Sequence, residues 1–351
     1  LFLFLLAAVL FTASNLLTPY LLHRMIGSEE VYRATMSYLD WRVYGFFFSF
    51  IAVMFRAFYV STTNTKILTA NSVVMVLTNV VLNYILIFGK FGFPALGIAG
   101  AAIASSISEA VSVLFFVIYT WKKIDYKKYG LFRFTRVDFR MLGQILSVSI
   151  WVMIQHGIAF GGWFIFFIAM EHLGERPLAI TNVVRSISSF LFMFVNAFAS
   201  TNSSLVSNLI GAGESDRVLP LCRRMIGLCY AFVLPIGILI AMFPSTVLRI
   251  YTDNPDLIAS SIPSLWVMLS SYLFAVPGFI YFFSVSGTGN TRRALEIDMA
   301  SIFVYVLYIL YVAVWLRADV AVCWTTEYVY NIMILSSFFY LWKGNWRNKK
   351  I

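Results

Sequence analysis

Ionisable side chains inside apolar runs are the clearest chemical signal in this sequence, because a charge in the core of a bilayer is costly and is usually kept for a reason. Arg56 and Glu109 occupy two such runs, which are expected to cross the membrane in the same direction. At 1.5 Å per residue, both lie roughly 15 to 18 Å from the same membrane boundary. They predict an intramembrane ion pair, which serves either in gating and ion coupling or as a static lock between two helices.

Two further side chains can carry charge within the membrane. Arg185 is expected about two turns inside one boundary, where it either extends outward toward Glu171 or Glu175 or faces a cavity and contacts anionic groups. His156 lies near the middle of another apolar run. Because histidine titrates near neutral pH, it is a candidate proton carrier, and a structural hydrogen bond between helices is the alternative.

Polar and aromatic residues near these side chains predict the wall of a substrate cavity. The polar candidates serve either a cavity or contacts between helices; they are Gln155, Asn182, Asn196 and Asn202. The aromatic candidates lie deep enough to stack on a flat cationic substrate, with packing or lipid contact as the alternative; they are Trp163, Trp266 and Tyr272. Together with Arg185, these residues make up the predicted substrate site.

The composition places all of these residues in a membrane protein. The hydrophobic fraction is 60%, the charged fraction is 12% and the mean hydropathy is +0.83, whereas soluble domains carry about 25% charged residues. Ten apolar runs of roughly 20 residues are long enough to cross a bilayer. They cover residues 1–22, 43–60, 68–88, 96–120, 142–170, 178–200, 221–243, 262–284, 295–316 and 320–342. The sequence therefore predicts an all-α polytopic membrane protein.

The basic residues divide unequally between the two sets of loops that join these spans. One set holds 17 Lys and Arg residues and the other holds 7. By the positive-inside rule the richer set is cytoplasmic, so the net charge of +10 predicts topology, with a cytoplasmic C-terminus, and not a nucleic-acid site. The longest basic loop, 122–140, separates a predicted N-lobe, 1–121, from a C-lobe, 141–351.

Motifs of enzymes that act on nucleotides, peptides or esters are absent from the sequence. It contains no GxxxxGK[ST], no HExxH and no GxSxG. We therefore expect a protein that is not an enzyme, that has no catalytic residues, metal or cofactor, and that draws energy from an ion gradient. Cys222, Cys229 and Cys323 form no CxxC motif and are expected to be small packing residues.

An internal repeat relates the beginning of the chain to its second half. Pro19 matches Pro244 and Asn64 matches Asn290, at offsets of 225 and 226 residues. The polar stretch 61–66 and its counterpart "SVSGTGNTRR" are expected to be turns between spans. Extended upstream, and because the chain opens inside an apolar run without a Met, the repeat predicts two further helices before Leu1. The complete bundle is then expected to hold 6+6 helices with a parallel pseudo-twofold repeat, as in secondary transporters.

Two motifs connect the sequence to a known family. "NVVLNYILIFGKFGFPALGIAGAAIASSIS" at 79–108 resembles the fifth and sixth helices of the MATE transporters, the multidrug and toxic compound extrusion family of the MOP flippase superfamily. "SSLVSNLIGAGESDRV" at 203–218 resembles the end of their eighth helix. The order of elements matches over essentially the entire chain, starting at the family's third helix. The small residues of the first motif also suit close packing of helices in lipid.

The resemblance implies where ion coupling lies. In one branch of the family, an Asp on the first helix, an Asn and an Asp on the fifth and a Thr on the sixth form a network. Here the fifth-helix pair falls on Asn79 and Asn83, and the Thr falls on Ser105. Asn83 cannot ionise, so amide oxygens are expected to bind a cation or water, whereas a proton needs the first-helix Asp. Carboxylates that another branch carries on the seventh and tenth helices fall near Ala159 and Ala275, so a site of that kind is expected to be lost.

The sequence thus predicts a secondary active multidrug efflux transporter that exports amphiphilic or cationic compounds by alternating access, in antiport with H+ or Na+. We expect a monomer in the bacterial inner (cytoplasmic) membrane, with small organic molecules and the lipid bilayer as its partners. Three alternatives remain: a lipid-linked oligosaccharide flippase of the same superfamily, an integral membrane enzyme acting on lipid, and an inactive truncated chain. The flippase predicts a cavity with several basic residues, and the enzyme predicts clustered His or acidic residues.

Overall fold

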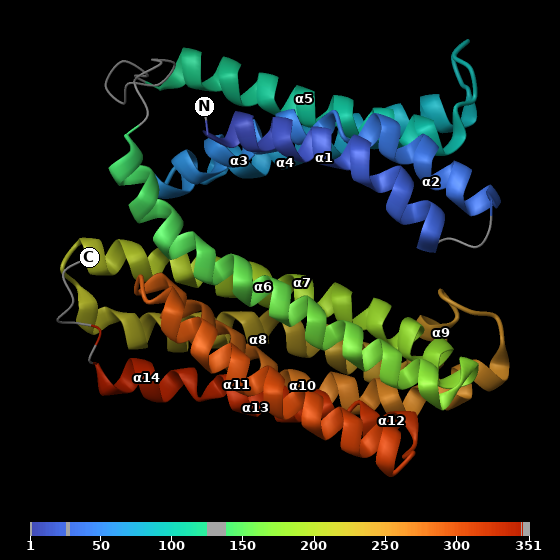
Figure 1. Cartoon of the computed structure of the whole chain (residues 1–351). Helices are drawn as coiled ribbons and strands as arrows, with labels where there is room; N and C mark the ends of the chain where they lie inside the picture. The colour runs from blue at the N-terminus through green and yellow to red at the C-terminus, as the bar shows by residue number, and fades with distance from the viewer. Residues whose placement is uncertain (1, 26–28, 125–137, 345, 347–351) are drawn as a thin grey trace. The chain divides into compact units, whose positions relative to one another are not determined.

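The chain forms two compact units, Leu1–Val137 and Asp138–Ile351. The structure, a computed structural model, describes residues 2–25, 29–124, 138–344 and 346 (Figure 1). Both units are built from helices and turns, and no β-strand occurs in these ranges. Most of the predicted loop between the lobes, residues 125–137, lies outside the described residues.

The first unit is arranged around one long helix. Its elements are α1 (Phe2–Met25), α2 (Glu29–Arg42), α3 (Gly45–Ser61), α4 (Lys66–Phe88) and α5 (Gly97–Lys123). Helices α2, α3 and α4 all pack against α5, and α1 packs against α3 (Figure 1). The small residues of α5 permit this, since Ala102 and Ala104 are fully buried and Gly100 lies against the backbone of Leu86.

The second unit is arranged around α10. Its elements are α6 (Phe139–Leu173), α7 (Glu175–Gly211), the 3₁₀ turn η1 (Ser215–Arg217), α8 (Val218–Met242), α9 (Pro244–Leu248), α10 (Pro255–Gly287), α11 (Thr291–Ile309), the π-helical segment η2 (Leu310–Trp315), α12 (Val320–Cys323), α13 (Thr326–Leu335) and α14 (Ser337–Lys343). Helices α7, α8, α11 and α13 pack against α10, and α6 packs against α11 and α7. More than half of the apolar window of α10 is buried within the unit.

Local sequence signals explain where several of these helices begin and end. Asp138 caps α6, because its carboxylate accepts hydrogen bonds from the backbone amides of Arg140 and Met141. Asn254 caps α10 in the same way, and Pro255 occupies the first helical position, where no amide hydrogen is needed. Gly89 ends α4 with a φ of +65°, a conformation that favours glycine.

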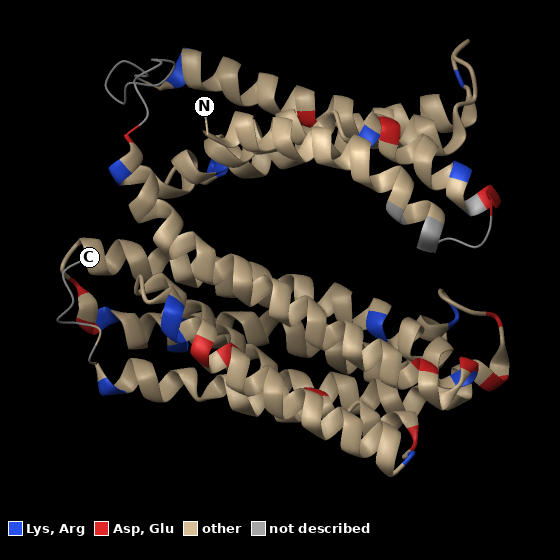
Figure 2. Cartoon of the chain, viewed as in Figure 1, with Lys and Arg blue, Asp and Glu red and all other residues tan. Residues whose placement is uncertain are grey.

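Eight of the described helices are long and apolar enough to cross a membrane, or nine if the bent pair formed by residues 32–42 and 45–61 counts as one span. Within each unit, the charged residues gather toward the helix ends and few lie in between (Figure 2). Helix α7 holds 37 residues, so it is roughly 55 Å long and extends well beyond a hydrocarbon core of about 30 Å. A polytopic all-α membrane fold is therefore confirmed.

Two of the ten predicted spans differ from the structure. The span 43–60 is the second half of a helix pair bent by 50°, and the charged segment before it is also helical because it packs against α5. The span 320–342 is present as three successive short helices, α12 to α14, none of which alone is long enough to cross. Hydropathy alone shows neither the bend nor the breaks.

The two polar stretches of the repeat form turns, as predicted. The first joins α3 to α4, and the backbone amide of Asn64 donates to the carbonyl of Tyr59 at 3.0 Å. The second joins α10 to α11, and the side chain of Asn290 donates to the hydroxyl of Tyr340 at 2.7 Å. Both stretches are therefore explained by the local structure that they form.

The cysteine prediction is also confirmed. Cys222, Cys229 and Cys323 are free and fully buried. The Cys222 thiol lies 3.3 Å from the hydroxyl of Ser284, inside the packing between α8 and α10. All three side chains behave as small core residues.

Replacement of Gly100 by Ala should destabilise the first unit. A Cβ at this position meets the carbonyl oxygen of Leu86 at 2.6 Å, so the backbones of α4 and α5 must separate. We expect a cost of about 1 to 3 kcal/mol, measured as a lower thermal unfolding midpoint of the purified protein in detergent. Gly143→Ala is the matched control, since that helical glycine has no neighbour within 4 Å. Equal midpoints for the two variants would contradict the close approach.

Candidate functional site

The second unit carries an open cavity of about 590 Å³, and several of its lining residues, such as Phe160 and Phe164, are exposed. Its wall is formed by side chains from α6, α7, α10, α11 and α13. Aromatic rings dominate the wall; they are Phe160, Trp163, Phe164, Phe167, Phe192, Tyr272, Phe279, Phe282, Phe283, Tyr305 and Tyr330. Its charged members are Asp298, Glu327 and Arg185, so the cavity carries more acidic than basic side chains.

Six of the predicted site residues lie at this wall. They are Gln155, His156, Trp163, Arg185, Asn196 and Tyr272. Tyr272 is held in place by its hydroxyl, which donates to the carbonyl of Ser188 on α7 at 2.7 Å. The Trp163 ring stacks on Phe167, with 6.1 Å between the ring centroids. The sequence thus placed residues from three separate helices at one site.

Arg185 takes the cavity alternative. Its guanidinium carbon lies 4.4 Å from the centre of the Phe167 ring, a cation–π contact on the cavity wall. Among the described residues, it forms no ion pair with Glu171 or Glu175. His156 also borders the cavity and is exposed, so it is not a buried link between helices.

Three predicted residues lie elsewhere. Trp266 is 52% exposed and does not border the cavity, because it lies on a different face of α10 from Tyr272. Asn182 is exposed on α7 outside the cavity wall. Asn202 is fully buried and donates to Ser284 at 2.7 Å, so it takes the alternative of a contact between helices, here α7 and α10. None of the three borders this cavity.

The sequence prediction missed the two carboxylates of the cavity. Asp298, on α11, is 2% exposed and accepts a hydrogen bond from the Tyr330 hydroxyl at 2.9 Å. Glu327, on α13, is half-buried at the cavity wall and lies near Tyr305, whose buried hydroxyl forms no hydrogen bond with the described residues. A signal was present, because both acids fall inside predicted spans. Their positions also align with Tyr305, Tyr330 and Asn331 at the seven-, three- and four-residue spacings of one helix face.

The predicted amide network of the first unit is assembled between α4 and α5. The Asn79 amide donates to the hydroxyls of Ser105 and Ser108 at 3.3 and 3.4 Å, and the Asn83 amide donates to the Asn79 oxygen at 2.9 Å. The Asn83 side-chain oxygen is buried without a hydrogen-bond partner among the described residues. These contacts join the two helices and leave one amide oxygen available to a ligand.

The ion pair predicted between Arg56 and Glu109 is wrong in its arginine. Glu109 pairs with Arg42, at the end of α2, through two hydrogen bonds of 2.6 and 3.0 Å. Gly45 leaves room for the Arg42 side chain, and Ser106 of α5 donates to the Trp41 carbonyl at 3.1 Å. Arg56 is exposed instead. The sequence predicts a loop for residues 23–42, between two apolar runs, so it gives no sign that an arginine of this segment reaches Glu109.

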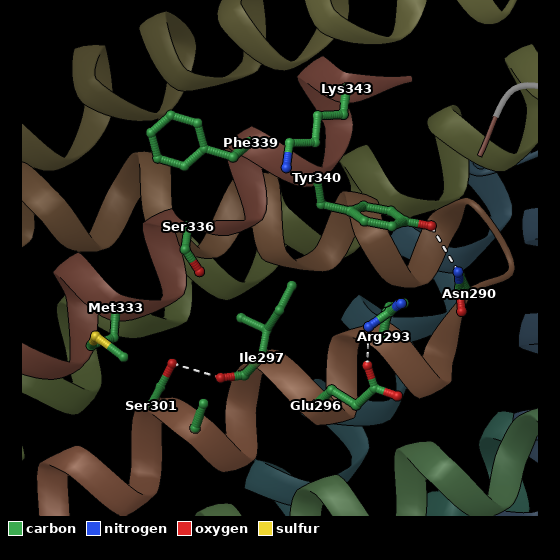
Figure 3. A pocket seen from close by; sticks show the side chains of 11 residues that line it. Asn290, Arg293, Glu296, Ile297, Ser301, Met333, Ser336, Phe339, Tyr340 and Lys343 are labelled. Carbon is green, nitrogen blue, oxygen red and sulfur yellow. Dashed lines mark hydrogen bonds and ion pairs between the residues drawn. The ribbon is translucent and has the colours of Figure 1, made fainter. Parts of the chain in front are cut away.

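A second pocket, of about 600 Å³, lies between α11, α13 and α14 (Figure 3). Its charged side chains lie near one end of the helices, where Arg293 pairs with Glu296. None of the predicted site residues borders it. The candidate site is therefore the aromatic cavity with its two carboxylates.

Comparison with known proteins identifies the family. The MatE family profile matches residues 1–85 and 158–314. The chain belongs to the MatE family. A probable multidrug resistance protein NorM of Thermotoga maritima is 29% identical over 239 residues, which cover 67% of this chain and 50% of that relative. The probable multidrug resistance protein YoeA of Bacillus subtilis is 26% identical over 275 residues, 78% of this chain and 59% of its own length.

Solved MATE structures share the fold of this MatE chain. The MATE transporter VcmN of Vibrio cholerae in its bent form has a TM-score of 0.82 at 17% identity, covering 97% of this chain and 76% of its own. A MOP superfamily transporter from Pyrococcus furiosus has a TM-score of 0.86 at 16% identity, with the same coverage. The MatE chain spans about half the length of the curated relatives that it matches.

The corrected ion pair makes a prediction about stability. Arg42→Gln or Glu109→Gln should each destabilise the protein by about 1 to 3 kcal/mol, because each leaves one partly buried charge unmatched. This is less than for a fully buried pair, since the Arg42 and Glu109 side chains are 29% and 17% exposed. Arg56→Gln is the control. Thermal unfolding in detergent should show lower midpoints for Arg42→Gln and Glu109→Gln and an unchanged midpoint for Arg56→Gln. An equally lowered midpoint in Arg56→Gln would favour the Arg56–Glu109 pair that the sequence predicts.

Proposed function

We propose that this protein is a secondary multidrug efflux transporter that exports cationic or amphiphilic organic compounds by alternating access, in antiport with H+ or Na+. It acts as a transporter and not as an enzyme, as a monomer in the bacterial inner membrane with its C-terminus in the cytoplasm. Support comes from relatives named multidrug resistance proteins, from the MatE family match and from the distribution of basic residues.

The observation that carries the proposal is the combination of rings and carboxylates in one cavity. Aromatic faces attract organic cations by about 0.5 to 1 kcal/mol at exposed sites and by more where water is displaced. Glu327 adds a negative charge next to the Tyr305 and Tyr272 rings. Such a wall suits a flat cation with apolar substituents, because the carboxylate balances its charge and the rings contact its apolar surface.

The same wall argues against the flippase alternative. A pyrophosphate-linked saccharide needs several basic groups to balance its charge. Arg185 is the one Lys or Arg among the described residues of this wall, whereas Asp298 and Glu327 contribute two carboxylates to the same cavity. The wall therefore favours cations over anions. The lipid-modifying enzyme is not supported either, since the described residues contain no group of three His, Cys, Asp or Glu side chains that could hold a metal.

Efflux should depend on Glu327. In inverted membrane vesicles that contain the protein, ethidium should accumulate inside the vesicle when the H+ or Na+ concentration is higher inside than outside. Glu327→Gln should lower the initial rate on the order of tenfold, because one charge that compensates the cation is lost and each 1.4 kcal/mol corresponds to a factor of ten. Ethidium movement is followed by fluorescence at equal protein levels.

Glu296→Gln is the matched control for this experiment. Glu296 is an exposed glutamate on α11 that pairs with Arg292 and Arg293, outside the aromatic cavity. It should transport at the wild-type rate. If neither the H+ gradient nor the Na+ gradient changes ethidium movement, the protein is not an antiporter. If Glu327→Gln transports at the wild-type rate, ethidium does not depend on the carboxylate of this cavity.

A further inference from the structure

The second pocket, between α11, α13 and α14, shares no lining residue with the aromatic cavity. Helix α13 packs against both α10 and α11, whereas α14 packs against α10. The chain turns more tightly between α13 and α14, because the amides of Ser336 and Phe339 donate to the carbonyls of Met333 and Ser336, three residues back. With this break α14 follows α10, and a space of about 600 Å³ remains beside α11.

Two rows of side chains line the second pocket. Within each row the members are three or four residues apart, which places them on one helix face. They are Arg293, Ile297 and Ala300 from α11 and Met333, Ser336, Tyr340 and Lys343 from the segment α13 to α14. The Asn290 amide donates to the Tyr340 hydroxyl at 2.7 Å, so the start of α11 lies beside α14 (Figure 3). Arg293 and Lys343 therefore belong to the same end of the pocket.

This end of the pocket holds more positive than negative charge. Arg292 and Arg293 both pair with one carboxylate, that of Glu296. Lys343 forms no ion pair in the described part of the chain. The Tyr340 hydroxyl accepts from Asn290, so its own hydrogen is available to a ligand. The charged end thus offers hydrogen-bond donors and unmatched positive charge, which suit an anion.

The rest of the pocket is mainly apolar. Ile297, Ala300, Met333 and Phe339 line it. Phe339 is 61% exposed, and an exposed aromatic ring near the end of a membrane span lies against lipid. Ala300 follows Arg293 by seven residues, so it lies roughly 10 Å farther along α11. Because α11 is one of the apolar spans, the pocket leads from the membrane boundary into the hydrocarbon.

We propose that the second pocket binds an anionic phospholipid, with its phosphate between Arg293 and Lys343 and its acyl chains along Ile297, Ala300 and Phe339. Guanidinium and ammonium groups are common partners of phosphate, and basic pockets between membrane helices bind anionic headgroups. A free phosphate ion would contact the charged end alone, whereas a phospholipid occupies both ends. The bound lipid joins α11 to α14 and stabilises the second unit. This site goes beyond the proposed transport and does not depend on it.

The test measures lipid binding to the purified full protein in detergent. Dioleoylphosphatidylglycerol is titrated in and the thermal unfolding midpoint is recorded, because a ligand that binds the native state raises that midpoint. Two further probes distinguish the source of the phosphate. Dioleoylphosphatidylcholine has the same acyl chains and no net charge, and inorganic phosphate at equal ionic strength has no acyl chains. Phosphatidylglycerol should raise the midpoint more than either of them.

Three variants locate the binding site. Arg293→Gln and Lys343→Gln should each raise the phosphatidylglycerol concentration of half-maximal effect about fivefold, which corresponds to about 1 kcal/mol per basic side chain. Ala300→Phe places a ring in the apolar part without changing the charge, and should raise that concentration by a similar factor. Arg224→Gln is the matched control, because Arg224 is exposed on α8 and does not border the pocket. Its half-maximal concentration should equal that of the wild type.

Lys343 is exposed at the last position of α14, so Lys343→Gln serves as the test if Arg293→Gln does not fold. A midpoint that phosphatidylglycerol does not change would overturn the lipid site. An equal rise with phosphatidylcholine would contradict the role of the basic residues, and an equal rise with inorganic phosphate would contradict the role of the apolar part. Wild-type half-maximal concentrations in both Lys343→Gln and Ala300→Phe would show that the lipid does not bind in this pocket.

Discussion

A carboxylate inside a membrane protein must be matched by hydrogen bonds and by positive charge, because the surrounding medium offers it little solvation. Asp298 and Glu327 are subject to this constraint. Each lies at the wall of one cavity with a tyrosine hydroxyl beside its carboxylate. Neither is matched by a basic side chain among the described residues, which is why a cation that enters from outside is the natural partner of this cavity.

The helices of the second unit serve that arrangement. Helices α11 and α13 pack against each other, so Asp298 lies beside Tyr330 and Tyr305 lies beside Glu327. The ring centroids of Tyr305 and Tyr330 lie 5.9 Å apart, in an edge-to-face contact. The two carboxylates are thereby placed at separate positions along one wall. The position of Glu327, near the rings of Tyr305 and Tyr272, suits an organic cation.

The sequence was sufficient for the class of fold and for part of the site. Hydropathy found the long helices, and the small-residue motif correctly indicated the close contact of α4 with α5. Hydropathy gives the depth of a residue but not the direction of its side chain. Trp266 and Tyr272 both fall inside the predicted span 262–284, yet they lie on different faces of α10, and of the two Tyr272 borders the cavity. Arg42 was missed as the partner of Glu109 because a charged helix that packs against α5 has the composition of a loop. Asp298 was missed because it follows Arg292, Arg293 and Glu296 near the start of its helix, where charged side chains are usually exposed.

We propose that an organic cation binds in the cavity of the second unit, where Glu327 and the aromatic rings compensate its charge. The equilibrium binding of tetraphenylphosphonium to the purified protein in detergent measures this directly. The affinity should fall on the order of tenfold in Glu327→Gln, since each 1.4 kcal/mol corresponds to a factor of ten, and should be unchanged in Glu296→Gln. An equal affinity in the wild type and in Glu327→Gln would show that the organic cation does not bind at this carboxylate.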